Sequence, residues 1–257
     1  MDLRIEGKVA LVCASTSGLG LGIARALAAE GAKVVITGRR AALARELAST
    51  MTGALGLGVD LASPLGPDAL VDEVEAIYSS IDILVLNSGG PAPGPASGLT
   101  DDNLTTAFDL LVRPQRQLIE RTLPGMVARR WGRILAVGSS GVVEPLPNLS
   151  ASNVGRAALA GLLKTLAREV AGEGVTCNMI LPGRIGTDRT RQLDAAAADR
   201  QGTDPESIRA ASSAAIPVGR YGTTDEFGAV AAFICSDQAS YITGSHIRVD
   251  GGLARSY

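Results

Sequence analysis

Residues 8–30 read KVALVCASTSGLGLGIARALAAE and carry the most informative pattern in the chain. An apolar run with β-branched residues predicts a buried strand over residues 8–14. A turn containing Gly18 and Gly20 follows. Residues 18–30 then show helical spacing, and Gly31 supplies a stop signal. A strand, a glycine-rich turn and a helix in this order are typical of a unit that binds a dinucleotide.

The same alternation of strands and helices continues along the chain. Further strands are predicted over residues 33–37, 54–60, 82–86, 132–138, 175–181 and 246–250, and helices over residues 41–51, 67–80, 101–130, 150–172 and 224–236. Continuous apolar strands that alternate with helices favour an α/β fold: a doubly wound parallel sheet (Rossmann fold) with helices on both faces. No linker divides the chain, so we expect one domain over residues 1–257.

One long irregular stretch, residues 182–217, interrupts this alternation. It holds several arginines and an alanine-rich segment near residues 193–199 that predicts a short helix. Long loops at the carboxyl ends of strands often cover ligands, so this stretch is predicted to form a lid.

The composition excludes several classes of function. The net charge is −2 and no basic stripe occurs, so neither nucleic acid nor a membrane surface is an expected partner. The longest apolar runs have the length of strands, and the N-terminal residues lack a signal-peptide pattern. Cys13, Cys177 and Cys235 are widely spaced in apolar segments and suit no metal or disulfide motif. We therefore expect a cytoplasmic protein without a bound metal.

The turn after the first strand predicts a phosphate site. Glycines allow the backbone to approach a pyrophosphate, and the N-terminus of the following helix offers free N–H groups and a partial positive charge. The residues expected to contact the cofactor here are Ser15, Ser17, Gly18, Leu19 and Gly20.

The end of the second predicted strand indicates which dinucleotide binds. An acidic residue at this point would bind a ribose 2′-hydroxyl, but the chain has Arg39 and Arg40 instead. Guanidinium groups pair well with a 2′-phosphate, so NADP(H) is predicted in preference to NAD(H). The alternative is that both arginines simply begin a solvated helix.

These motifs and several later ones resemble the short-chain dehydrogenase/reductase family over about residues 6–252, and the bacterial 3-oxoacyl-[acyl-carrier-protein] reductases are the branch that the chain resembles. Residues 13–20 correspond to the family's Thr-Gly-x-x-x-Gly-x-Gly, with Ala14 in place of the first glycine. The other matching segments are Asp60-Leu61, Asn87-Ser88-Gly89-Gly90, 182–187, 217–220 and 243–252. The resemblance implies that the adenine lies at Asp60 and Leu61 and the nicotinamide carboxamide at Ile185 and Thr187, with Asn87 and Gly89 as further cofactor contacts.

The family's catalytic set of Asn, Ser, Tyr and Lys is altered. Ser139 matches the serine, whereas the tyrosine and lysine positions hold Ser152 and Arg156, and the asparagine position holds Leu111. The downstream residues Ala158-Leu159, Gly161-Leu162 and Lys164 support this register. Aligning residues 149–153 with the family's Tyr-Ser-Ala-Ser-Lys would need an insertion inside the helix, and we reject that alternative.

The predicted function is therefore an NADP(H)-dependent oxidoreductase of a carbonyl or alcohol substrate, with Ser139, Ser152 and Arg156 as the catalytic set. We expect Arg156 to hold ribose hydroxyls and developing negative charge, because an arginine does not readily deprotonate. Two alternatives remain open: a non-redox enzyme resembling the halohydrin dehalogenases, and a pseudoenzyme that binds cofactor without turnover.

Other groups are candidates for a proton donor, and the long helices suggest assembly. Glu144 and Tyr257 are candidate acids, but a surface role is favoured for Glu144 and a frayed terminus for Tyr257, whereas His246 is expected to be structural. The two longest predicted helices carry more leucines than one core face needs, which favours a homotetramer, with a dimer as the alternative: Leu110, Leu111, Leu118, Leu159, Leu162, Leu163 and Leu166.

Overall fold

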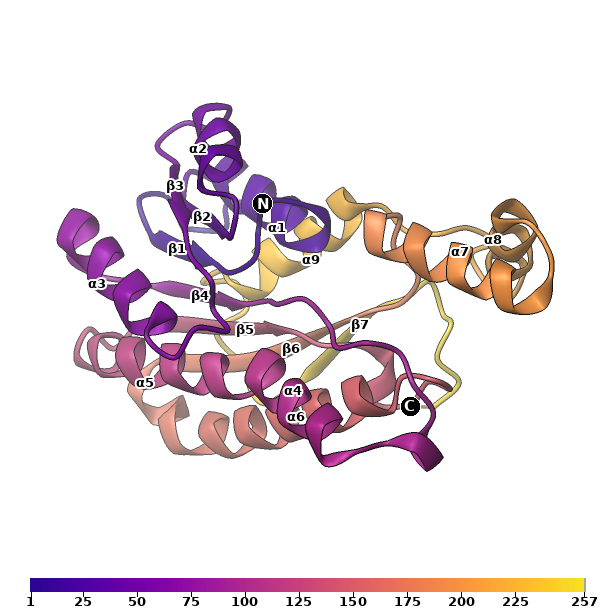
Figure 1. Ribbon diagram of the computed structural model, residues 1–257. Helices are drawn as coiled ribbons and strands as arrows, with labels where there is room; N and C mark the ends of the chain where they lie inside the picture. The colour runs from indigo at the N-terminus through magenta and orange to yellow at the C-terminus, as the bar shows by residue number, and fades with distance from the viewer. Residues whose placement is uncertain (257) are drawn as a thin grey trace.

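The computed structural model describes residues 1–256 and contains one parallel sheet between two layers of helices (Figure 1). The strand order is β3-β2-β1-β4-β5-β6-β7, and every neighbouring pair is parallel. The predicted doubly wound fold is confirmed. The strands are β1 (Val9–Val12), β2 (Lys33–Gly38), β3 (Leu55–Gly58), β4 (Ile83–Leu86), β5 (Gly132–Val137), β6 (Val175–Pro182) and β7 (His246–Val249).

The direction of winding reverses between β1 and β4. β1 pairs with β2 on one side, where Val12 faces Ile36, and with β4 on the other, where Val12 faces Val85. Ligands of open α/β sheets bind beyond the carboxyl ends of strands at such a reversal. The topology therefore directs attention to the loops that follow β1 and β4.

Two groups of helices cover the sheet (Figure 1). One face carries α1 (Gly18–Ala29), α2 (Ala41–Ser49) and α9 (Thr224–Ile234). The other face carries α3 (Gly66–Tyr78), α5 (Arg113–Ala128) and α6 (Ser150–Val170), and α4 (Asp101–Leu111) packs on α6. Short 3₁₀ helices lie at η1 (Ala96–Gly98), η2 (Ser140–Val142) and η3 (Ala171–Glu173).

The single helix predicted over residues 101–130 is wrong, because the chain breaks at Val112 into α4 and α5. Val112 has φ −123° and ψ −57°, outside helical values. Pro114 explains the break, since proline has no N–H and its ring clashes with the carbonyl four residues earlier, here that of Leu110. The break places Leu111 at the end of α4.

The predicted lid contains two helices, α7 (Asp188–Gln201) and α8 (Pro205–Ala214), which project from the sheet (Figure 1). The prediction of one short helix near residues 193–199 is therefore wrong in extent, because α7 is longer and a second helix, α8, follows it. The chain just before α7 and the chain after α8 are joined: Gly186 N–H donates to the Gly222 carbonyl, and Gly222 N–H donates to the Arg184 carbonyl, both over 2.9 Å.

A buried carboxylate on α7 links this helix to residues that precede α7 and follow α8. Asp194 on α7 is only 3% exposed. It accepts a hydrogen bond from Arg184 Nη1 at 2.7 Å and one from the Tyr221 hydroxyl at 3.0 Å. Because a buried charge is costly unless it is paired, these contacts fix how α7 leaves the sheet.

Most of the leucines that suggested assembly serve the protein's own core. Leu111, Leu118, Leu159, Leu163 and Leu166 are buried within the chain, while Leu110 and Leu162 remain partly exposed. The five buried leucines are therefore not available for subunit contacts, which weakens the basis for predicting a homotetramer. Within residues 1–256, no helix combines the length and the apolar character needed to cross a membrane.

Candidate functional site

The turn after β1 is built around two backbone features. Ala14 adopts the left-handed region with φ +44°, which L-residues rarely do, and Gly18 has φ +56°. A Cβ on Gly20 would lie 2.6 Å from the Ala14 carbonyl oxygen, so only glycine fits there. The N-terminus of α1 thus lies close against the turn, as a pyrophosphate site requires.

Ser15 shapes this turn from inside. Its hydroxyl donates to the Val12 carbonyl at 2.6 Å and accepts from Thr37 N–H at 2.9 Å, and its own N–H donates to the Thr37 carbonyl. The Ser15 side chain is fully buried. Of the five residues predicted here, Ser15 therefore joins β1 to β2, and Ser17, Gly18 and Leu19 lie nearer the surface.

Asn87 connects the loop after β4 to the same turn. Its side-chain amide donates to the carbonyls of Ala14 (3.1 Å) and Cys13 (3.3 Å). Gly89 follows on the exposed part of this loop. The prediction that Asn87 and Gly89 belong to the site with residues 15–20 is consistent with this placement, and the structure gives Asn87 a role in holding the turn.

Arg39 and Arg40 are both exposed where β2 ends and α2 begins. Gly38 adjoins the Thr16 side chain, since a Cβ on Gly38 would lie 2.9 Å from it. The two arginines therefore flank the turn, as expected for binding at its ribose end. Asp60 and Leu61 follow β3, and the Asp60 carboxylate accepts from Ala62 N–H at 3.1 Å.

The segment after β6 closes the opposite side. Ile185 is buried, and Thr187 caps α7 by accepting from Thr190 N–H at 3.2 Å. The Thr187 methyl carbon lies 3.6 Å from the Cβ position of Gly18, which is far away in the sequence. The structure therefore brings the two predicted cofactor segments together.

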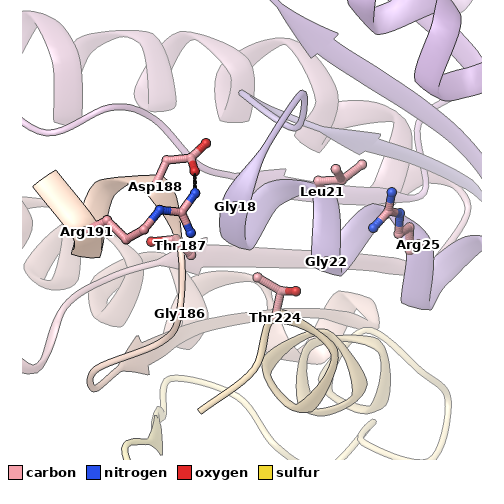
Figure 2. Close-up of a pocket in the computed structure, with 9 residues that line it drawn as sticks. All are labelled: Gly18, Leu21, Gly22, Arg25, Gly186, Thr187, Asp188, Arg191 and Thr224. Atoms are coloured by element: carbon pink, nitrogen blue, oxygen red, sulfur yellow. Dashed lines mark hydrogen bonds and ion pairs between the residues drawn. The ribbon is translucent and has the colours of Figure 1, made fainter. Parts of the chain in front are cut away.

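Figure 2 shows a hollow of about 150 Å³ at this junction. Thr187 and Arg191 enter it from the start of α7, and Arg25 lies along α1. Sequence reasoning did not assign Arg25 to the site. Its position seven residues after Gly18, on the same helical face, was the available signal. The complete lining is Gly18, Leu21, Gly22, Arg25, Gly186, Thr187, Asp188, Arg191 and Thr224.

The predicted catalytic residues lie together at the carboxyl end of β5. Ser139 follows the strand, and its hydroxyl accepts from Gly141 N–H at 3.1 Å. Arg156 reaches across from α6: its Nη1 donates to the carbonyls of Val137 (2.7 Å) and Gly138 (3.0 Å). Its Nε donates to the Ser152 hydroxyl at 3.3 Å.

These contacts determine what Arg156 can offer a ligand. A guanidinium has five N–H donors. Among the described residues, Nε and Nη1 of Arg156 find partners, whereas Nη2 donates to none. Burial, and then the charge of Arg189, lower the pKa of Arg156 to about 10. Arg156 is therefore a cation at neutral pH with one nitrogen left for binding.

Leu111, at the end of α4, lies directly against α6. A Cβ on Gly155 would be 2.8 Å from the Leu111 Cδ1, and Leu111 is 2% exposed. An apolar side chain thus packs against Gly155, the residue before Arg156, and it can neither donate nor accept a proton.

The other proposed acids have different roles. Glu144 Oε1 accepts from the N–H groups of Arg255 (2.8 Å) and Ser256 (2.9 Å), so it holds the C-terminal segment. His246 is exposed on β7, and burial and the Lys164 charge lower its pKa. Tyr257 lies outside the described residues.

Comparisons with known proteins show which proteins the chain is similar to. Residues 13–254 match the family model described as enoyl-(acyl carrier protein) reductase. The chain is 34% identical over 255 residues to the 3-oxoacyl-[acyl-carrier-protein] reductase of Salmonella typhimurium, covering 98% of this chain and 99% of that protein.

Solved structures resemble the chain over its full length. L-sorbose reductase from Gluconobacter frateurii, complexed with NADPH and L-sorbose, has a TM-score of 0.94 and 33% identity, with 100% of both chains covered. YwfH, an NADPH-dependent reductase involved in bacilysin biosynthesis, has a TM-score of 0.92 and 26% identity, covering 98% of this chain and 100% of that one.

Proposed function

The chain belongs to the short-chain dehydrogenase/reductase family, and from that premise we propose that it is an NADP(H)-dependent oxidoreductase of a carbonyl or alcohol substrate. The observation that carries the proposal is the position of Arg156, which spans from α6 to the backbone carbonyls at the end of β5, directly before Ser139. The relatives whose structures contain or use NADPH support the choice of cofactor.

The residues fit a dinucleotide. The turn has no room for a side chain at position 20, so glycine is required there. The N-terminus of α1 is free to receive a pyrophosphate. Arg39 and Arg40 are exposed and suit a 2′-phosphate. The remaining contacts would come from Asp60, Leu61, Asn87, Gly89, Ile185 and Thr187. When bound, the nicotinamide supplies or accepts a hydride.

The protein's own residues then act on the substrate oxygen. The Ser139 hydroxyl orients that oxygen by donating a hydrogen bond to it. Arg156 Nη2 stabilises the negative charge that develops there, because a fixed cation at the reacting oxygen is a strong electrostatic aid. Ser152, held by Arg156 Nε, lines the pocket and anchors a water molecule, from which the reduced oxygen takes its proton.

The absence of a tyrosine at position 152 is expected to lower the rate of reduction without abolishing it. General acid–base help is worth about 10²–10⁴-fold, or roughly 3–5 kcal/mol of barrier. Positioning the reactants can contribute on the order of 7–11 kcal/mol. We therefore expect slow reduction of simple β-keto esters. Retention of the turn after β1 favours this function over a halohydrin-dehalogenase-like one, and a pseudoenzyme is the remaining competitor.

The test is NADPH oxidation, followed by absorbance, across a panel of ketones and diketones. Turnover should be measurable and should fall at least about tenfold in Ser139→Ala, because one hydrogen bond to the reacting oxygen is lost. Ser49→Ala, on the exposed face of α2, is the control. NADPH binding without turnover on any substrate would identify a pseudoenzyme, and unchanged activity in Ser139→Ala would refute the assigned catalytic set.

We also propose a homotetramer in the cytoplasm, with a dimer as the alternative. The three buried, unpaired cysteines fit a reducing compartment. Light scattering at micromolar concentration should give a tetramer or dimer mass, and a monomer mass would contradict the proposal.

A further inference from the structure

Arg189 places a second cation at the site. It lies in the first turn of α7, and its side chain is exposed. Its Nη2 is 3.9 Å from the Cβ position of Gly90, in the loop that follows β4 and Asn87. The lid therefore places this guanidinium close to the loop that follows the central strand β4.

The positive charge of Arg189 also acts on Arg156. That charge is the second cause, after burial, of the lowered pKa of Arg156. In the described part of the chain, neither arginine forms an ion pair. The two carboxylates nearest in sequence serve others, since Asp188 pairs with Arg191 and Asp194 pairs with Arg184.

Two neighbouring cations without a counter-ion create a positive potential that attracts an anionic ligand. The N-terminus of α7 adds to this field, because helix N-termini also attract anions. The planar fork of a single arginine matches the two oxygens of a carboxylate.

We propose that the substrate carries a carboxylate, which Arg189 binds while the reacting oxygen lies at Ser139 and Arg156. This inference rests on the proposed function, and it narrows the substrate class to oxo acids or the corresponding hydroxy acids. The diphosphate of the cofactor is the other anion within reach of the lid, and the experiment below separates the two.

The test measures binding rather than turnover. Isothermal titration of the NADP⁺-saturated protein compares acetoacetate with methyl acetoacetate, pyruvate with methyl pyruvate, and 4-oxopentanoate with its methyl ester. The wild-type protein should bind at least one acid about tenfold or more tightly than its ester, as a charge-assisted contact predicts. Arg189→Met should abolish that preference and leave NADPH affinity within about twofold of wild type.

Arg200→Met is the matched control, because it removes the same charge from the exposed far end of the same helix. It should keep the preference for the acid. The proposal is overturned if every ester binds as tightly as its acid, if no acid binds at millimolar concentration, or if the preference survives Arg189→Met. A large loss of NADPH affinity in Arg189→Met with the preference retained would assign Arg189 to the cofactor diphosphate instead.

Turnover of the same compounds separates the two proposals. Acid-selective binding without NADPH oxidation would remove the proposed oxidoreductase function and leave the anion site intact. Reduction of neutral ketones with no acid preference would do the reverse.

Discussion

The side-chain amide of Asn87 donates a hydrogen bond over 3.1 Å to the carbonyl oxygen of Ala14, a residue held at φ +44°. The residue that follows β4 thus contacts Ala14, the one alanine in a left-handed conformation among residues 1–256. The geometry of the turn is maintained although a side chain occupies a position where glycine would be unstrained.

Ala14→Gly should therefore stabilise the protein. The left-handed conformation costs an alanine roughly 1–2 kcal/mol, and the greater freedom of glycine in the unfolded chain takes back about 0.5–1 kcal/mol. We expect a net gain of about 0.5–1 kcal/mol, seen as a higher urea midpoint with an unchanged slope. Ala26→Gly, inside α1, is the control and should lose about 1 kcal/mol. A loss of stability in Ala14→Gly would show that the residue is not strained.

Arg39 should determine the choice between NADPH and NADH. A charge-assisted hydrogen bond to a phosphate is worth about 1.5–3 kcal/mol, so NADPH should bind at least about tenfold more tightly than NADH. Arg39→Asp should reverse the preference by repelling the 2′-phosphate and accepting from a ribose hydroxyl. Calorimetric titration measures both affinities. Arg45→Asp, one turn into α2, makes the same charge change and should leave the preference in place, and tighter binding of NADH by wild type would refute the assignment.

Restoring the family's proton donor should raise the rate only when its neighbours change as well. Ser152→Tyr alone should have little effect, because Arg156 keeps its contacts with Val137 and Gly138. Together with Arg156→Lys and Leu111→Asn, it should increase NADPH oxidation with a reactive diketone by one or more orders of magnitude, within the range of about 10²–10⁴ for acid–base help.

Leu111→Asn is the substitution in this set that threatens folding. Leu111 is buried, and loss of a core leucine side chain costs about 2–5 kcal/mol. The double variant Ser152→Tyr/Arg156→Lys avoids this cost and should show a smaller gain in the same absorbance assay. A double variant no faster than wild type, with circular dichroism showing a folded protein, would contradict the assigned roles.

The free energy of unfolding should decrease at acid pH, because protonation of Glu226 weakens the N-terminal cap of α9. The Arg220 guanidinium and then the Thr223 N–H hold the pKa of Glu226 down to about 2, from an ordinary value of 4.5. Because the folded-state pKa is depressed, this contribution is complete above about pH 4.5 and is lost as the pH falls toward 2. In Glu226→Gln the cap can still form without the charge. Urea midpoints of variant and wild type should differ at pH 7 and converge near pH 2, and a constant difference would contradict the linkage.

The regular part of the fold could be predicted from the sequence because its signals are local. The apolar runs gave all seven strands, and the turn at residues 13–20 gave the dinucleotide-binding unit. The break at Val112 was missed because the helical pattern continues on both sides of it, and only Pro114 marks it. The second lid helix was missed because residues 205–214 are largely exposed and contain a single large apolar residue, Ile208.

The candidate site was predicted less completely, since part of it depends on contacts between distant segments. Ser139, Ser152 and Arg156 could be placed from motif spacing, and the structure brings them together. The Ser15 hydroxyl looked available but bonds to Val12 and Thr37, partners that spacing does not reveal. The approach of Arg189 to Gly90 depends on how the lid folds back, which no local pattern encodes.

The ends of the lid have a consequence for how such a protein can diversify. A backbone hydrogen bond joins Gly186 to Gly222, so the intervening segment leaves the sheet and returns to it at the same place. An insertion whose ends are already joined adds little loop-closure entropy when its length changes. We therefore expect that a different segment can be grafted between these glycines to alter substrate choice, with the turn after β1 and the strands unchanged.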